Sequence, residues 1–265
     1  MGTYVISDIH GCYDEFLAML KEIGFSDSDR LLIAGDYIDR GKQSYEMLRW
    51  LEHCPENILP IRGNHDEEFA SYVELMVYYE KRKGLHYDFK SHGDAVSLYE
   101  SVRHILGKKG SPFVYFDAYG TIRDLLLRYD ITLDDLHGWE EMIRKMPYYH
   151  ETEINGRSCI VVHAGYVEEE EDISASFSCP EEFYIYAREE GYQLGGKKHG
   201  MVIAGHTPTI IKGRFTYNRG NVFRFYNRKK DCIFYDIDCG CVFREWEQSA
   251  KLACLRLEDE TVFYI

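Results

Sequence analysis

The sequence lacks the features that mark membrane and secreted proteins. No segment approaches the ~18 consecutive apolar residues that a membrane-spanning helix needs. The stretch from Met1 to Ser7 carries no basic residue of the kind that opens a secretion signal. No internal repeat and no polar linker divides the chain. We therefore expect a single cytoplasmic domain spanning residues 1–265, without a membrane partner.

Positive charge is also in short supply. The 31 lysines and arginines are outnumbered by 45 aspartates and glutamates, which gives a formal net charge of −14 at pH 7. Because binding to nucleic acid without sequence preference needs a basic surface, we expect no nucleic-acid partner. The acidity is uneven: Glu168 to Asp172 is an unbroken run of carboxylates, which we interpret as a solvated loop.

The eight cysteines do not form the pattern of a disulfide scaffold or a zinc finger. They are spread over a long chain, and several lie in apolar segments, which favours reduced thiols in the core. Cys239 and Cys241 are the only close pair, and no second pair follows at zinc-finger spacing. We expect neither a structural nor a redox role for this pair.

What the sequence does contain is a series of short apolar runs, typical of buried strands in an α/β fold. Three strands near the amino terminus each lead into a loop and a helix, which predicts a largely parallel sheet. From about residue 67 to 145 the chain is helix-like, and we expect a helical insertion beside the cleft. Later strands are expected to run antiparallel and to form a second sheet. The expected strands are Thr3–Ile6, Leu31–Ala34, Ile58–Ile61, Tyr148–Ile154, Ser158–Val162, Met201–Ala204, Val222–Phe225, Cys232–Ile237 and Leu252–Leu257.

Polar residues of one chemical kind follow five of these strands, each beside a glycine. One such loop, Asp36 to Arg40, is as consistent with a surface ion pair as with a site, and a single histidine at a strand end is more often structural than a ligand. Five strand ends with the same residue types make coincidence a poor explanation. Carboxylate, imidazole and amide oxygens bind borderline divalent metals. The residues are Asp8, His10, Asp36, Asn64, His65, His163 and His206.

Together these motifs resemble the calcineurin-like metallophosphoesterases. The resemblance rests on Asp8-x-His10-Gly11, Gly35-Asp36-x-x-Asp39-Arg40-Gly41, Gly63-Asn64-His65-Asp66, His163-Ala164-Gly165 and Gly205-His206. The second motif resembles the phosphoprotein phosphatase branch, in particular bacterial and phage serine/threonine phosphatases and symmetrical dinucleoside-tetraphosphate hydrolases. The segment Asp236 to Cys241 is similar to a late family strand, with cysteine in place of threonine. The resemblance implies a sandwich of two sheets between helices, in four layers α/β/β/α.

The resemblance also implies a dinuclear metal site. Manganese is the metal it suggests, although iron, zinc, nickel and cobalt take the same ligands. Asp36 would bridge the two ions, and a hydroxide between them would attack phosphorus. The implied ligands are Asp8, His10 and Asp36 for the first ion, and Asp36, Asn64, His163 and His206 for the second.

The remaining motif residues are implied to act on the substrate. His65 would be the general acid for the leaving oxygen, with Asp39 holding its other ring nitrogen. Arg40 would bind phosphate oxygens through its guanidinium fork. We expect Asp66 to be structural.

A second phosphate-binding arginine is implied between the two late histidines. Arg188 is the only arginine there, and Lys197 and Lys198 are lesser candidates. The aromatic helix that precedes this arginine in the family is present, but its usual tryptophan is missing. The alternative is an exposed helix residue that pairs with Glu181 or Glu182.

Three functions follow from these expectations. The first is hydrolysis of phosphomonoesters, with phosphoserine and phosphothreonine in proteins ahead of small phosphoesters. The second is symmetrical hydrolysis of dinucleoside tetraphosphates, which the acidic run disfavours if that loop borders the cleft. The third is a binding protein that has lost catalysis, which intact His65, Asp39 and Arg40 argue against. Oligomeric state is not readable from the sequence.

Overall fold

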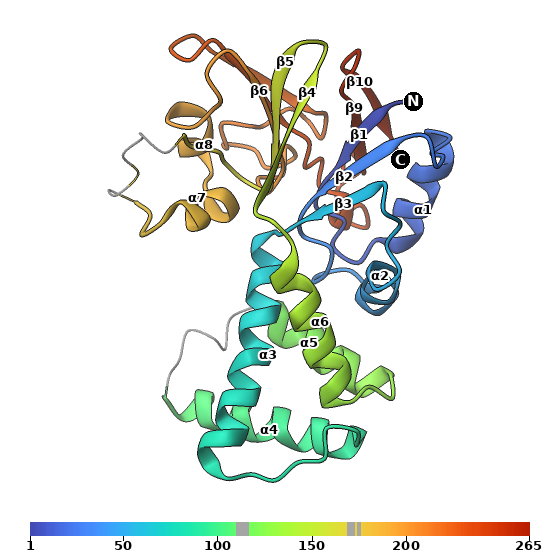
Figure 1. Ribbon diagram of the computed structural model, residues 1–265, viewed down its shortest axis with the longest axis vertical. Helices are drawn as coiled ribbons and strands as arrows, with labels where there is room; N and C mark the ends of the chain where they lie inside the picture. Colours follow the sequence, from blue (N-terminus) through green and yellow to red (C-terminus); the bar gives the residue numbers. More distant parts are fainter. Residues whose placement is uncertain (110–116, 169–172, 174–175) are drawn as a thin grey trace.

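The computed structural model describes residues 1–109, 117–168, 173 and 176–265. Two five-stranded mixed sheets lie side by side with helices outside them, and a bundle of helices extends away from the sheets as an arm (Figure 1). This is the two-sheet α/β sandwich that the motifs predict. Residues 169–172 of the acidic run lie outside the described residues. Among the helices that are described, none is both long and apolar enough to cross a membrane.

The first sheet joins the beginning of the chain to its end. Strand β1 pairs in parallel with β2, and β2 with β3, while β9 lies antiparallel on the other side of β1. The carboxyl-terminal β10 was not expected; none of its four residues is fully buried, which makes a weak apolar signal. The strand order is β10 (Thr261–Tyr264), β9 (Ala253–Arg256), β1 (Thr3–Ile6), β2 (Arg30–Ala34) and β3 (Ile58–Ile61).

The second sheet begins with a hairpin that turns at Asn155-Gly156. Both residues have positive φ angles, 51° and 76°, as a two-residue hairpin turn requires. Antiparallel pairing was expected for the later strands, and for β8 this expectation is partly wrong: β8 is antiparallel to β7 but parallel to β6. The strand order is β4 (Tyr149–Ile154), β5 (Arg157–Val162), β6 (Met201–Ala204), β8 (Cys232–Asp236) and β7 (Phe223–Asn227).

Burial on both faces explains why the strands read as continuous apolar runs. Val5 and Leu32 face the second sheet and pack with Val161, whereas Ile6 and Ile33 face the opposite way, into the core formed with the helices. Helices α1 (Tyr13–Glu22) and α2 (Ser44–Leu51) contribute to that core. The helices α7 (Pro180–Tyr186) and α8 (Glu189–Gln193) belong to the second sheet's side of the molecule (Figure 1).

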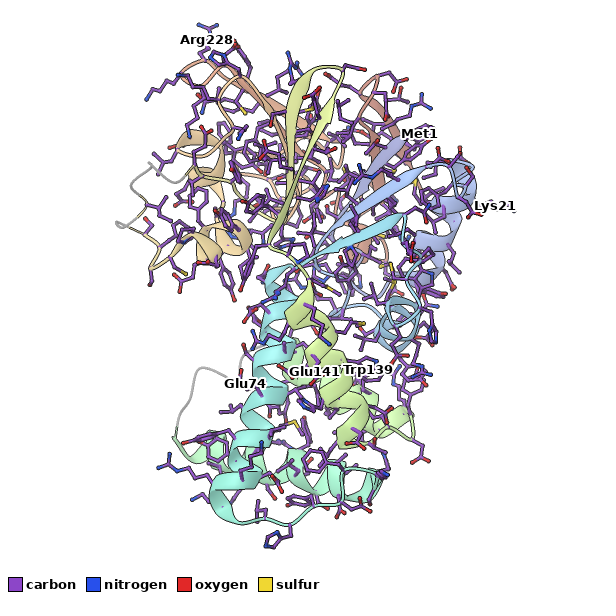
Figure 2. All side chains as sticks on the ribbon, viewed as in Figure 1. Met1, Lys21, Glu74, Trp139, Glu141 and Arg228 are labelled. Atoms are coloured by element: carbon purple, nitrogen blue, oxygen red, sulfur yellow. The ribbon has the colours of Figure 1, made fainter. Side chains whose placement is uncertain are left out.

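Among the described residues between β3 and β4, four helices form the arm. They are α3 (Asn64–Lys83), α4 (His92–Lys109), α5 (Asp117–Arg128) and α6 (Leu133–Lys145). Trp139 on α6, labelled in Figure 2, is buried and donates its indole N–H to Glu52 at the end of α2, at 2.7 Å. The arm is thereby tied to the sheet region at its base. That it is an insertion into one domain, residues 1–265, stays a prediction.

The cysteines are reduced and mostly buried, as expected. All eight are free thiols, including Cys239 and Cys241 in the core.

Candidate active site

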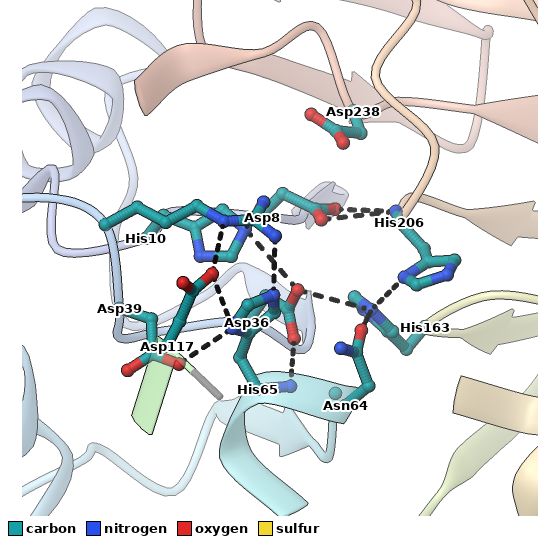
Figure 3. A network of polar contacts seen from close by, with 12 residues as sticks. Asp8, His10, Asp36, Asp39, Asn64, His65, Asp117, His163, His206 and Asp238 are labelled. Carbon is teal, nitrogen blue, oxygen red and sulfur yellow. Dashed lines mark hydrogen bonds and ion pairs between the residues drawn. The ribbon is translucent and has the colours of Figure 1, made fainter. Parts of the chain in front are cut away.

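The residues predicted from the strand ends meet at one edge of the sandwich. Figure 3 shows them around a common centre, coming from the ends of β1, β2, β3, β5 and β6. Most have strained backbones, with φ between 45° and 72° in the left-handed region, which costs a non-glycine residue on the order of 1–3 kcal/mol. The residues with these angles are Asp8, His10, Asp36, Asp39, Arg40 and His206.

Two glycines are needed because side chains of the site come directly against them. A Cβ at Gly63 would collide with the carboxylate of Asp36, and one at Gly205 would collide with the carboxylate of Asp8. The glycine beside each motif residue therefore has a packing reason.

Asp66 fixes the loop after β2 to the start of α3. Its buried carboxylate accepts hydrogen bonds from the backbone N–H groups of Asp36 (2.8 Å), Tyr37 (3.1 Å) and Gly63 (2.8 Å). Its bond to Gly63, the N-cap of α3, is the half of a capping box that a glycine N-cap permits. These contacts agree with the structural role expected for it.

One half of the site brings three acceptor atoms and a ring nitrogen of His206 together. His163 donates through Nδ1 to the carbonyl of Ala34 at 2.8 Å, so its Nε2 carries a lone pair. That Nε2 lies 3.0 Å from Asn64 Oδ1, 3.2 Å from His206 Nδ1 and 3.4 Å from Asp36 Oδ2. Burial lowers the pKa of both histidines and favours their neutral forms. A cluster of facing acceptors is unfavourable unless a cation lies among them.

The other half is built around His10. Its Nδ1 donates to the carbonyl of Ile38 at 2.8 Å, and its Nε2 faces Asp36 Oδ2 at 3.4 Å. Asp36 Oδ2 is therefore equally distant from His10 and His163, as a bridging ligand would be. Donor atoms of two groups lie within 4.8 Å of one another: His10 with Asp36 and His65, and Asp36 with His163 and His206.

Asp8 belongs to neither group. Its carboxylate accepts the backbone N–H of His206, at 3.2 and 3.0 Å. His65, which was expected to act rather than to bind metal, lies close enough to be grouped with His10.

Buried negative charge supports cation binding at this site. Burial, with the neighbouring Asp8 carboxylate adding to it, raises the pKa of Asp36 and of Asp238 well above the ordinary range. A divalent cation would offset the cost of burying these carboxylates in their charged form, because it supplies positive charge beside them. The residues present thus fit the two ions that the motifs imply.

Asp238 was not among the predicted site residues. It follows β8, and Figure 3 shows it above Asp8 and His206. Because β8 is parallel to β6, its carboxyl end reaches the same edge of the sheet; β8 was expected to be antiparallel, so Asp238 was not placed there.

His65 and Asp39 form the expected pair. His65 Nδ1 lies 2.7 Å from Asp39 Oδ2, and both side chains are buried. Burial lowers the pKa of His65, but the carboxylates of Asp36 and Asp39 outweigh it and raise the pKa to about 9. Arg40 Nη2 lies 2.8 Å from His65 Nε2. The contact with Arg40 opposes this rise in pKa: a guanidinium only donates, so His65 Nε2 accepts and the imidazole is neutral while Arg40 lies on it, whereas a pKa of about 9 favours the protonated form at neutral pH. Nε2 takes up a proton once Arg40 moves off it.

Three arginines line the cavity above the donor atoms. It has a volume of about 350 Å³ and is lined by Asp36, Arg40, Asn64, His65, Arg188, His206, Pro208, Ile211, Arg214 and Phe243. Arg40 and Arg188 are the two predicted phosphate-binding residues. Arg214 was not among the predicted site residues. It lies in the segment that follows His206, between β6 and β7, but no motif there marks it as a phosphate ligand.

The segment that carries Arg188 is not one continuous helix, because α7 ends at Tyr186 and α8 begins at Glu189. The helix is interrupted at Ala187 and Arg188, because the Glu190 carboxylate accepts the backbone N–H of Arg188 at 3.3 Å and the Ala187 backbone is extended. The break lets Arg188 reach Thr207 Oγ1 at 3.2 Å. The lesser candidate Lys197 instead pairs with Glu151 at 3.2 Å, away from the cavity.

Comparison with known proteins gives relatives that share part of the sequence. A protein of Buchnera aphidicola subsp. Acyrthosiphon pisum (strain Tuc7) and one of Salmonella paratyphi B, both named symmetrical bis(5'-nucleosyl)-tetraphosphatase, are 38% identical over 104 residues and 42% identical over 67 residues. The matched segments cover 39% and 25% of this chain, and 38% and 24% of those relatives. The chain therefore matches well under half the length of either relative.

Solved structures share the fold. A protein provisionally described as a diadenosine tetraphosphatase superposes with a TM-score of 0.57 at 14% identity, covering 100% of this chain and 93% of that one. A serine/threonine phosphatase of Saccharomyces cerevisiae with similarity to human phosphatase PP5 gives 0.54 at 14% identity, covering 100% and 79%. At such identities the likeness concerns the fold alone. Residues 1–209 match the family described as calcineurin-like phosphoesterase, so the chain belongs to that family.

Proposed function

We propose that this phosphoesterase hydrolyses phosphomonoesters of alcohols, with phosphoserine and phosphothreonine of proteins as its first substrates. The observation that carries the proposal is the buried Asp39–His65 pair, with the Nε2 of His65 at the wall of the cavity. An alkoxide is a poor leaving group, and it departs readily only when a positioned acid protonates it. A phosphoanhydride has a better leaving group and needs such an acid less.

Asp36, Asn64 and His206, three of the residues that we assign as metal ligands, line the same cavity. We assign Asp8, His10 and Asp36 to one divalent cation and Asp36, Asn64, His163 and His206 to the other, with manganese as the first choice. When bound, these cations would activate a water as the nucleophile and offset the negative charge of the phosphate. The protein residues hold the donor atoms in place through the backbone hydrogen bonds of His10 and His163.

Arg40 links phosphate binding to proton donation. Its Nη1 lies 3.1 Å from His10 Nε2, and its Nη2 lies 2.8 Å from His65 Nε2. A phosphate group would draw both nitrogens to its oxygens, since a charged acceptor binds a guanidinium more strongly than a neutral imidazole does. His65 Nε2 would then be free to take up a proton and to donate it to the leaving oxygen. Arg188 would bind the phosphate from the opposite wall.

A second candidate is hydrolysis of dinucleoside polyphosphates. Two observations favour it: Arg214 adds a third guanidinium to the cavity, more than one phosphate group requires, and the curated relatives carry that name. Arg214 therefore distinguishes the two substrates. Its loss would weaken binding of a polyphosphate chain and leave a single phosphate unaffected.

The test is a substrate panel on protein loaded with manganese. Phosphoserine peptide, p-nitrophenyl phosphate and diadenosine tetraphosphate are compared for wild type and for Arg214→Ala, with Arg219→Ala as an exposed control in the same segment. We expect the phosphopeptide to be turned over and Arg214→Ala to leave its KM unchanged. Hydrolysis of diadenosine tetraphosphate alone, with KM raised in Arg214→Ala but not in Arg219→Ala, would replace the first proposal by the second.

A further inference from the structure

We infer that helix α5 of the arm belongs to the catalytic apparatus: Thr121 positions the Asp39–His65 pair and Asp117 positions the guanidinium of Arg40. This inference rests on the proposed function, because it assigns partners to the groups proposed as acid and phosphate binder. The motifs that identify the family lie at strand ends. These two residues come from a helix far from those strands in the sequence.

Thr121 holds the oxygen of Asp39 that His65 leaves free. Asp39 Oδ2 is bound by His65 Nδ1 at 2.7 Å, and Asp39 Oδ1 accepts the hydroxyl of Thr121. Both residues are buried, with Asp39 fully inaccessible and Thr121 8% exposed. A carboxylate bound at both oxygens cannot rotate about its terminal bond. The direction of the His65 ring, and so of its Nε2, is therefore set in part from α5.

Asp117 lies one turn before Thr121 on the same face of α5. Its Oδ2 accepts from Arg40 Nε at 3.1 Å and lies 3.8 Å from His65 Nδ1. Figure 3 shows Asp117 and Asp39 together beside His65. Because Asp117 holds the Nε side of the guanidinium, Nη1 and Nη2 are left pointing at His10 and His65, where phosphate would bind. Asp117 thus aims the fork without occupying the nitrogens that the phosphate needs.

A second cavity lies beside this face of α5. It has a volume of about 260 Å³, and its walls include Arg40, Asp117, Thr121 and Asp124. The side chain of Asp117 is 48% exposed and that of Asp124 is 47% exposed. Asp124 pairs with Arg123 and Arg128 of its own helix. Asp124 is therefore a matched control for Asp117: the same residue type and exposure on the same helix, without a contact to the site.

The two residues are expected to affect different kinetic constants. Thr121→Val removes the hydroxyl and should lower kcat by about ten- to a hundredfold on substrates with poor leaving groups, and much less on p-nitrophenyl phosphate. Asp117→Asn should raise KM, and the inhibition constant of inorganic phosphate, several-fold with little change in kcat. A merely structural role for either residue would lower all rates together.

The experiment measures kcat and KM for a series of aryl phosphates, from p-nitrophenyl to phenyl phosphate, with manganese-loaded protein. Thr121→Val should steepen the dependence of kcat on leaving-group pKa, and Thr121→Ser should restore the wild-type slope. Thr121→Ala serves in place of Thr121→Val if the latter does not fold. Asp124→Asn should match wild type throughout.

The outcomes separate the inference from the function on which it rests. Wild type that hydrolyses no member of the series refutes the proposed function and the inference with it. Active wild type, with an unchanged slope in the Thr121 variants and an unchanged phosphate inhibition constant in Asp117→Asn, refutes the inference alone.

Discussion

Replacing His65 by asparagine separates proton donation from metal binding at this site. The variant keeps the backbone N–H of residue 65, which binds Asp36 Oδ1 at 3.0 Å, and leaves every assigned metal ligand in place. It removes the imidazole between Asp39 and the cavity. Metal content should therefore stay at two ions per chain, while protonation of the leaving oxygen is lost.

The expected loss follows from what a general acid supplies. Positioned acids accelerate such reactions by about 10²–10⁴-fold, equal to ~2.7–5.5 kcal/mol of barrier. We expect an acceleration within this range from His65, because its Nδ1 lies 2.7 Å from Asp39 Oδ2 in a buried pair that fixes the ring. We expect kcat on phosphoserine peptide to fall by about that factor, and kcat on p-nitrophenyl phosphate to fall by less than about tenfold, since nitrophenolate leaves without a proton.

Stability changes in a predictable direction as well. Asp39 Oδ2 loses its partner in a buried place, which costs about 1–3 kcal/mol and lowers Tm by roughly 2–12 °C for a chain of this size. The assays are steady-state kinetics on both substrates, metal analysis of the purified variant and a thermal melt. Equal losses on both substrates would refute the general-acid role. Loss of one metal ion would show that His65 is a ligand, as its place beside His10 and Asp36 allows.

Three further perturbations test other parts of the structure. Removing metal with a chelator should abolish activity. Manganese at about 100 times its Kd should raise Tm by roughly 5–11 °C, because binding to the folded state alone adds ~2.7 kcal/mol to the free energy of unfolding. An unchanged Tm would count against the buried donor set. Gly205→Ala should lose metal, since the new Cβ collides with the carboxylate of Asp8, whereas Gly138→Ala on α6, where a Cβ meets open space, should bind metal normally. Trp139→Phe should lower the free energy of unfolding by about 1 kcal/mol, because Glu52 loses the hydrogen bond from the indole N–H. Its kcat should stay at the wild-type value. A large fall in kcat would mean that the base of the arm controls the site.

The parts of the site that sequence could predict share one physical origin. A parallel strand carries the residue after it to a fixed edge of the sheet, so Asp8, Asp36 and Asn64 had to meet once their strands were recognised. The same rule brings His163 and His206 together, because β5 and β6 are parallel. Short apolar runs are enough to apply it.

This placement of residues at the sheet edge fails when the direction of a strand is predicted wrongly. Asp238 follows β8 and lies near Asp8, yet the parallel pairing of β8 with β6 is long-range and leaves no mark on the local pattern. The backbone strain at His10 and Arg40 was equally invisible, since these residues would not be chosen for positive φ by any local preference. Only the surrounding contacts hold them there.

The contribution of α5 lies beyond the rule altogether. Thr121 is separated from Asp39 by 82 residues and Asp117 from Arg40 by 77, and no strand directs either toward the site. Their approach depends on how the arm packs against the loop after β2, which is a property of the folded chain. The metal donors can therefore be inferred wherever the strand motifs occur. The orientation of the His65 imidazole and of the Arg40 guanidinium depends on the particular arm. On this reasoning, a chain with the same strand ends and a different arm would keep its metals and differ in its preference for leaving group.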